Sequence, residues 1–154
     1  MRILALLFLL IIAGPAIAQD APLVGNWKLV AFQTIVEGEP SNIYGAQPKG
    51  VLILTREGRA AAIITGETRK AGNSEAERAE LYKTVIAYSG KYRIEGKEFV
   101  TTVDMSWNEV WNGTEQRRFW RFEDGKLIVD TAPIPAPNFP GKMVVARLIW
   151  EREK

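Results

Sequence analysis

Gly25-Asn26-Trp27 opens the first of eight segments that have the composition and length of β-strands. The expected strands span residues 24–36, 50–55, 59–65, 88–94, 97–107, 114–122, 126–131 and 142–151. Most are separated by tight glycine turns, among them Asp124-Gly125, a dipeptide that favours two-residue hairpins. Short turns make sequence neighbours pair in antiparallel fashion, and eight such strands close into a barrel that holds one small ligand. The sequence therefore predicts an all-β fold.

Two connections depart from this pattern. Ser74 and Glu77 have the spacing of a helix-capping box, which predicts a helix over 76–87 between the third and fourth strands. Its apolar stripe would either cap one barrel end or pack on the outer wall. The segment 132–141 contains four prolines, so we expect a stiff loop there and not a central strand.

The first residues have the pattern of an export signal. Arg2 supplies the positive start, residues 3–13 form an uncharged apolar run, and Ala16-Ile17-Ala18 provides the small residues that a signal peptidase reads. We expect cleavage of residues 1–18, leaving one domain over 19–154. The alternative is a membrane anchor, but the run has 11 residues, whereas crossing a bilayer takes about 20. We therefore expect an exported protein, periplasmic or secreted, without a stable membrane anchor.

Composition excludes several chemistries. The chain has no cysteine and no histidine, which removes Ser-His-Asp and Cys-His nucleophiles and thiolate or histidine metal sites. It has 20 basic residues, one of them Arg2, against 18 acidic residues, so the chain without its signal carries +1. Such a balance disfavours nucleic acid as a partner. We expect no cofactor and no metal; the sequence leaves the oligomeric state open.

Several blocks of sequence occur in a fixed order. They are Gly25–Val30, Tyr44-Gly45 with Pro48 and Gly50, Tyr88–Tyr92, Trp111–Gln116, Arg118 and Arg147–Arg152. In this order the chain resembles the bacterial lipocalin-like domain family, small calycin-type barrels that are mostly uncharacterised, from about Leu23 to Arg152. With the strand pattern, the resemblance implies an eight-stranded antiparallel up-and-down lipocalin-like barrel with a hollow interior. Members often carry a histidine in the fifth strand, where this chain has Thr101 and Thr102, so no role of that histidine is carried over.

The resemblance also implies a structural role for the opening motif. In barrels of this type the glycine lets the entering chain approach the barrel floor, and the tryptophan, here Trp27, plugs that floor. A basic side chain of the last strand lies across the indole. Arg147 and Arg152 are both candidates, because a bulge in the last strand would exchange the faces on which they lie.

Alternation with a period of two predicts the barrel lining. In the fifth strand, one face carries Phe99, Thr101, Val103, Met105 and Trp107. Aromatic side chains on such faces either stack on a ligand or form plain barrel core, and residues in the long connections belong at the mouth. The ligand-binding residues predicted in this way are Tyr44, Tyr88, Tyr92, Trp107, Trp111, Gln116, Arg118 and Trp120.

Arg118 is the least expected of these residues, because alternation places its guanidinium on an otherwise aromatic face. A buried cation needs a partner. The partner is either internal (Asp104, Asp130 or a tyrosine hydroxyl) or a ligand carboxylate or phosphate held by two hydrogen bonds. Internal pairing is the commoner arrangement, and the sequence leaves both open.

Two functions from different classes fit these features. The first is an exported protein that binds a small hydrophobic or amphipathic ligand, neutral or acidic, in the barrel interior. The alternative is a cofactor-free isomerase or cyclase that holds a small hydrophobic substrate in the same cavity, with Tyr88, Gln116 and Arg118 as its polar groups. The lack of histidine favours binding, and no catalytic residue is assigned.

Overall fold

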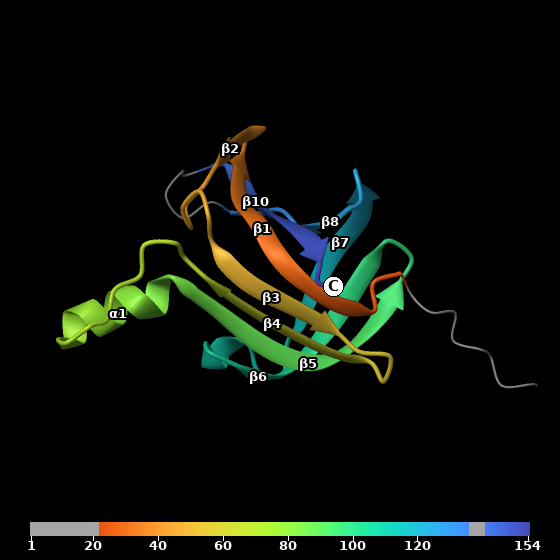
Figure 1. Ribbon diagram of the computed structural model, residues 1–154, viewed down its shortest axis with the longest axis horizontal. Coiled ribbons are helices and arrows are strands. Elements are labelled where there is room, and N and C mark those ends of the chain that lie inside the picture. Colours follow the sequence, from red (N-terminus) through yellow and green to blue (C-terminus); the bar gives the residue numbers. More distant parts are fainter. Residues whose placement is uncertain (1–21, 136–140) are drawn as a thin grey trace, which may run out of the picture.

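Eight antiparallel strands close into a barrel in the computed structural model, which describes residues 22–135 and 141–154 (Figure 1). The barrel strands are β1 (Gly25–Val36), β3 (Lys49–Leu54), β4 (Arg59–Thr65), β5 (Val85–Glu95), β6 (Glu98–Ser106), β7 (Glu115–Glu123), β8 (Lys126–Thr131) and β10 (Met143–Arg152). Each strand pairs with its neighbour in this order, and β10 pairs with β1 to close the ring. Two short strands, β2 (Glu39–Ser41) and β9 (Ile134–Pro135), are added beside β1 and β10. The expected eight-stranded up-and-down barrel is confirmed.

The two ends of the barrel differ in their connections. The turns β3–β4, β5–β6 and β7–β8 lie at one end, and all three are short. At the turn after β7, Asp124 and Gly125 have φ values of 48° and 73°, as a tight hairpin requires. The long connections between β1 and β3, β4 and β5, β6 and β7, and β8 and β10 lie at the other end, which we call the mouth.

Trp27 seals the end that carries the tight turns. Its side chain is 1% exposed, and its indole N–H donates to the Leu23 carbonyl at 2.9 Å. The guanidinium of Arg152 lies 4.1 Å from the indole ring and donates to the carbonyls of Pro22 and Val24. A side chain at Gly25, whose φ is 142°, would overlap the Arg152 guanidinium. The basic residue over Trp27 is therefore Arg152, and the motif forms a floor.

A bulge between β5 and β6 changes which residues face inward. Ser89 pairs with Met105 but the next residue, Gly90, pairs with Val103, so Asp104 is an extra residue in β6. Phe99, Thr101 and Val103 are buried as predicted. Beyond the bulge the alternation reverses, and Met105 is 62% exposed, so its predicted inward position is wrong.

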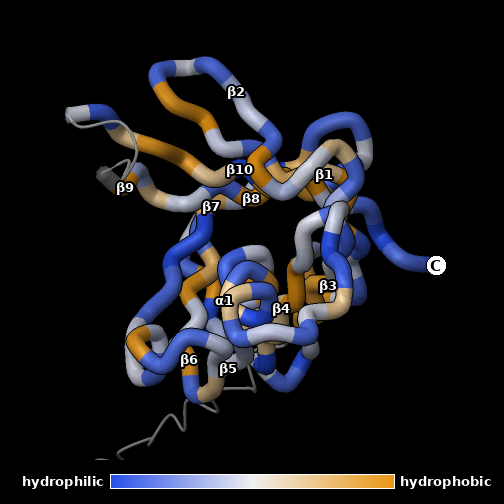
Figure 2. Tube along the Cα trace, turned by 90° about the vertical axis from the view of Figure 1, so that its left-hand side faces the viewer, coloured by the Kyte–Doolittle hydropathy of each residue, from blue (hydrophilic) through white to orange (hydrophobic). Residues whose placement is uncertain are grey.

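The helix α1 (Glu75–Lys83) lies between the third and fourth barrel strands, β4 and β5, as expected. Its capping box of Ser74 and Glu77 is formed. The helix ends four residues earlier than predicted, because Val85 and Ile86 pair with β4 as the start of β5. None of its side chains is buried, polar residues predominate on it (Figure 2), and it projects from the barrel (Figure 1). α1 therefore buries no apolar stripe against the barrel, and its ring contact is that of Tyr82 with Trp107, at 6.4 Å between centroids.

The proline segment includes β9, which pairs with Met143 and Val144 at the start of β10, the end of that strand at the mouth. Residues 136–140 of that segment lie outside the described residues, as do residues 1–21 with the expected cleavage site. Within 22–135 and 141–154, no helix has both the length and the apolar character needed to cross a membrane.

Candidate ligand-binding site

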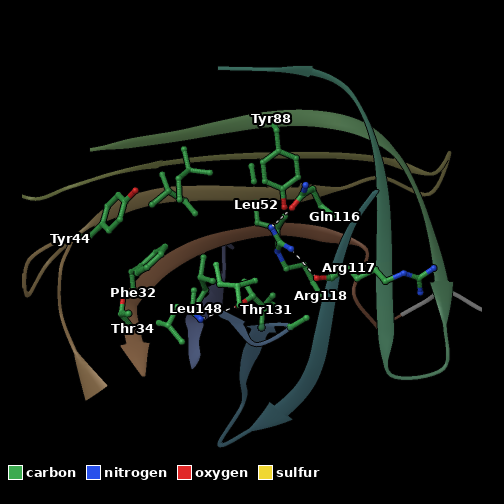
Figure 3. Close-up of a pocket in the computed structure, with 18 of the residues that line it drawn as sticks. Phe32, Thr34, Tyr44, Leu52, Tyr88, Gln116, Arg117, Arg118, Thr131 and Leu148 are labelled. Carbon is green, nitrogen blue, oxygen red and sulfur yellow. Dashed lines mark hydrogen bonds between the residues drawn. The ribbon is translucent and has the colours of Figure 1, made fainter. Parts of the chain in front are cut away.

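A cavity of about 700 Å³ occupies the barrel between the floor and the mouth (Figure 3). All eight barrel strands contribute side chains to it. Most of its wall is hydrocarbon, from Phe32, Leu52, Ala62, Ile64, Ile86, Phe99, Val129, Leu148 and Trp150. A cavity of this volume falls within the range of small-molecule sites, about 300–1,000 Å³.

The rim of the cavity at the mouth is also apolar. Ile43 before β3 and Ile134 of β9 line the cavity and are 65% and 54% exposed. Tyr44 stacks on Phe32 with ring centroids 4.4 Å apart, and both rings line the cavity. Burial raises the pKa of Tyr44, against an opposing effect of Arg69, so its hydroxyl stays neutral at pH 7. On this side of the entrance, an apolar molecule therefore meets the uncharged side chains of Ile43, Tyr44 and Ile134.

The charged and amide side chains of the wall come from β7, and Tyr88 of β5 lies beside them. The guanidinium of Arg118 donates to the Arg117 carbonyl at 2.8 Å and to the side-chain oxygen of Gln116 at 3.1 Å. The Gln116 amide nitrogen donates to the Thr114 hydroxyl at 3.1 Å, which fixes the orientation of the amide. The ring of Tyr88 lies 6.0 Å from the Arg118 guanidinium. Figure 3 shows Tyr88, Gln116 and Arg118 close together on one side of the cavity.

The carboxylates predicted as internal partners of Arg118 are paired elsewhere. Asp104 accepts two hydrogen bonds from Arg59. Asp130 accepts hydrogen bonds from Arg147 at 2.9 and 3.1 Å and from Arg121 at 2.7 Å. Burial raises the pKa of Asp130, but the bonds from Arg147 and Arg121 outweigh it and leave that pKa lowered. The internal carboxylate partner expected from the sequence is therefore absent among the described residues.

Glu115 lies at the rim of the cavity, and its carboxylate is paired with two arginines, Arg93 and Arg117. It accepts a hydrogen bond from Arg93 at 2.8 Å, which lowers the pKa of its carboxyl group, and a second bond from Arg117. Arg117 also donates to Glu95 and Glu98 on the outer surface. Three charged residues thus line the cavity, and within the described chain Arg118 alone among them has no ion pair. No cluster of three potential metal ligands occurs in that part of the chain.

Five of the eight predicted ligand-binding residues line the cavity. They are Tyr44, Tyr88, Trp111, Gln116 and Arg118. Trp111 belongs to the short helix η1 (Glu109–Trp111), and its ring meets the edge of Tyr88 at 5.5 Å. The predicted alternation of β7 is thus confirmed at Gln116 and Arg118.

The other three predicted residues lie outside the lining. The Tyr92 hydroxyl donates to the Thr55 carbonyl at the β3–β4 turn, near the floor. Trp107 follows the end of β6 and packs behind Trp111, with centroids 4.8 Å apart. Trp120 is further along β7 toward the floor, with Lys97 5.0 Å above its ring. Tyr92 and Trp120 differ from the lining residues in depth, which alternation does not predict. Trp107 lies beyond the bulge in β6, where the alternation reverses.

Other lining residues were not singled out by sequence reasoning. Phe32, Leu52 and Leu148 are ordinary apolar positions in predicted strands. Alternation alone marks them as inward, and nothing distinguishes them from core residues. Ile43 and Ile134 lie in connections, where no periodicity applies.

A comparison with protein-family models matches a lipocalin-like domain over residues 24–153. The chain belongs to the lipocalin-like domain family. No curated protein matches this lipocalin-like chain. A closed barrel of this family, hollow and apolar inside, is in general suited to bind a small molecule.

Proposed function

We propose that this lipocalin-like protein is exported and carries a small hydrophobic molecule with an acidic group inside its barrel. The observation that supports this most is Arg118, a guanidinium in an apolar cavity whose described lining offers it no ion pair. Arg118 is half-buried, and a guanidinium beside an apolar wall pairs favourably with an anion through charge-assisted hydrogen bonds. A ligand carboxylate would supply the missing partner, and the hydrocarbon wall would bury the remainder of the ligand, at about 0.8 kcal/mol per methylene.

Export is part of the same proposal and rests on the N-terminal pattern. Arg2, the apolar run and Ala16-Ile17-Ala18 fit a cleaved signal. We expect N-terminal sequencing of the protein recovered from periplasm or medium to begin at Gln19. A protein retained in the cytoplasm that still begins at Met1 would contradict this part of the proposal.

A carrier function is favoured over catalysis by the lowered pKa of Glu115, the one carboxylate among the described residues that line the cavity. Glu115 has a lowered pKa because it accepts hydrogen bonds from Arg93 and Arg117. A general base works best with a pKa near the operating pH. Glu115 is therefore a weak base. The polar groups of the isomerase or cyclase alternative, Tyr88, Gln116 and Arg118, include no carboxylate or imidazole to act as a general base at neutral pH, so that alternative is not proposed.

Binding is tested with N-phenyl-1-naphthylamine, a neutral fluorescent probe of hydrophobic sites. We expect saturable binding to the wild-type protein. Ala62→Phe should weaken it at least tenfold, because Ala62 is buried in the cavity wall and a phenyl ring there fills ligand space. Ala61→Phe is the matched control, since the neighbouring position in β4 faces outward. Failure of the wild type to bind, or equal binding by both variants when circular dichroism shows them folded, would contradict the proposal.

A further inference from the structure

The charges in the described lining limit a ligand to one negative charge. Arg117 donates to Glu95, Glu98 and Glu115, so its own charge is neutralised at the outer surface. Glu115 is neutralised in turn by Arg93 and Arg117. One guanidinium, that of Arg118, is left for a ligand.

The donors of Arg118 fit a planar acceptor. A guanidinium has five N–H groups, and Arg118 uses two of them, one on each terminal nitrogen. Each terminal nitrogen thus keeps one N–H, and Nε keeps its own. A carboxylate accepts two parallel hydrogen bonds from such a fork. The Gln116 side chain and the Arg117 carbonyl hold the guanidinium in place, so little ordering is needed when a ligand binds.

Other head groups fit this site less well. A phosphate monoester carries about −1.5 to −2 charges at pH 7, so part of its charge would stay unpaired in an apolar cavity. An alcohol or a methyl ester has no charge and would leave the cation of Arg118 unpaired. A carboxylate matches both the charge and the shape.

The cavity also gives the ligand a direction. Figure 3 shows Phe32 and Tyr44 across the cavity from Arg118, with Leu52 and Leu148 between the two sides. The floor is filled by Trp27, which is 1% exposed. A hydrocarbon chain that starts at Arg118 therefore extends toward the stacked rings of Phe32 and Tyr44 near the mouth.

From these observations we infer that the ligand is a single-chain monocarboxylate, held at Arg118 with its tail toward Phe32 and Tyr44. This inference rests on the proposed function and adds to it the acid class, the charge and the orientation.

The test is displacement of N-phenyl-1-naphthylamine by four compounds with the same chain: dodecanoate, dodecanol, methyl dodecanoate and dodecyl phosphate. In the wild type we expect dodecanoate to displace the probe at least tenfold better than the other three. Arg118→Met should remove that advantage, and Arg118→Lys, which keeps the charge without the fork, should reduce it. Arg121→Met should preserve it, because Arg121 lies on the same strand and pairs with Glu123 and Asp130 outside the cavity.

Orientation is read from nuclear Overhauser effects in the dodecanoate complex. We expect the terminal methyl group to contact the rings of Phe32 and Tyr44; contacts to Trp111 and Tyr88 instead would overturn the orientation. Equal displacement by all four compounds, or the strongest displacement by dodecyl phosphate, would overturn the inference. If the wild-type protein still binds the probe in such an experiment, the proposed carrier function stands. A wild-type protein that binds neither the probe nor any of the four compounds would overturn both.

Discussion

Replacing Arg152 by methionine tests whether Gly25-Asn26-Trp27 forms a structural floor. Arg152 makes one cation–π contact with Trp27 at 4.1 Å and donates hydrogen bonds of 2.7 and 2.8 Å to the Pro22 and Val24 carbonyls. The cation–π contact is worth about 1 kcal/mol at an exposed site. Each hydrogen bond adds about 1 kcal/mol net. Methionine keeps an apolar chain over the indole, so we expect Arg152→Met to lower the free energy of unfolding by about 2–3 kcal/mol.

The assay is equilibrium unfolding in urea, followed by tryptophan fluorescence and by circular dichroism. Lys28→Met is the control, because Lys28 also pairs with β10, through Glu151 at 3.4 Å, but both side chains are well exposed. Exposed ion pairs contribute little, so this control should lose less than about 0.5 kcal/mol. Arg152→Lys should fall between the two, since lysine lacks the second hydrogen-bonding arm.

Two results would refute this reasoning. One is a loss for Arg152→Met no larger than that for Lys28→Met, at an unchanged denaturant slope. The other is a folded, equally stable Arg152→Met protein that has lost N-phenyl-1-naphthylamine binding, which would place Trp27 in the ligand site.

Three further predictions concern the walls of the barrel. Gly90→Ala should destabilise the protein by about 3 kcal/mol in urea unfolding, because a Cβ at the bulge would overlap the Thr102 carbonyl oxygen; wild-type stability would contradict the bulge. Asp130→Asn should cost about 2 kcal/mol at pH 7. The folded pKa of Asp130 is lowered, so its contribution is full above the unfolded value of about 3.9 and is lost as pH falls through the folded pKa. Wild type and variant should therefore converge in stability at acid pH, and a constant difference would refute the pairing. Met105→Lys should be tolerated within about 0.5 kcal/mol, whereas Val103→Lys should prevent folding, as judged by circular dichroism.

Much of the fold could be predicted from local signals. Glycine turns and alternation located the eight strands, and the capping box of Ser74 and Glu77 located the helix. Where these signals failed, the cause was a contact distant in sequence. The bulge that turns Met105 outward depends on pairing between β5 and β6. The end of α1 depends on Val85 and Ile86 joining β4.

The candidate site was predicted in part for a similar reason. Alternation along β7 placed Gln116 and Arg118 in the interior, where the cavity lies. Alternation does not predict how deep in the barrel a residue lies. Trp120 was therefore included among the predicted ligand-binding residues although it lies toward the floor. Nor could the partners of Asp104 and Asp130 be predicted, because Arg59 and Arg147 reach them from other strands. Only the assembled barrel shows that Arg118 is left without either carboxylate.

The central claim is that Arg118 binds a carboxylate inside the barrel, and ¹³C NMR of dodecanoate labelled at its carboxyl carbon tests it most directly. A carboxylate paired with a guanidinium is harder to protonate, so its pKa falls. The bound signal in the wild-type complex should titrate at lower pH than free dodecanoate, and this shift should be lost in Arg118→Met. A bound carboxyl group that titrates at or above the pH of the free acid in both proteins would contradict the account.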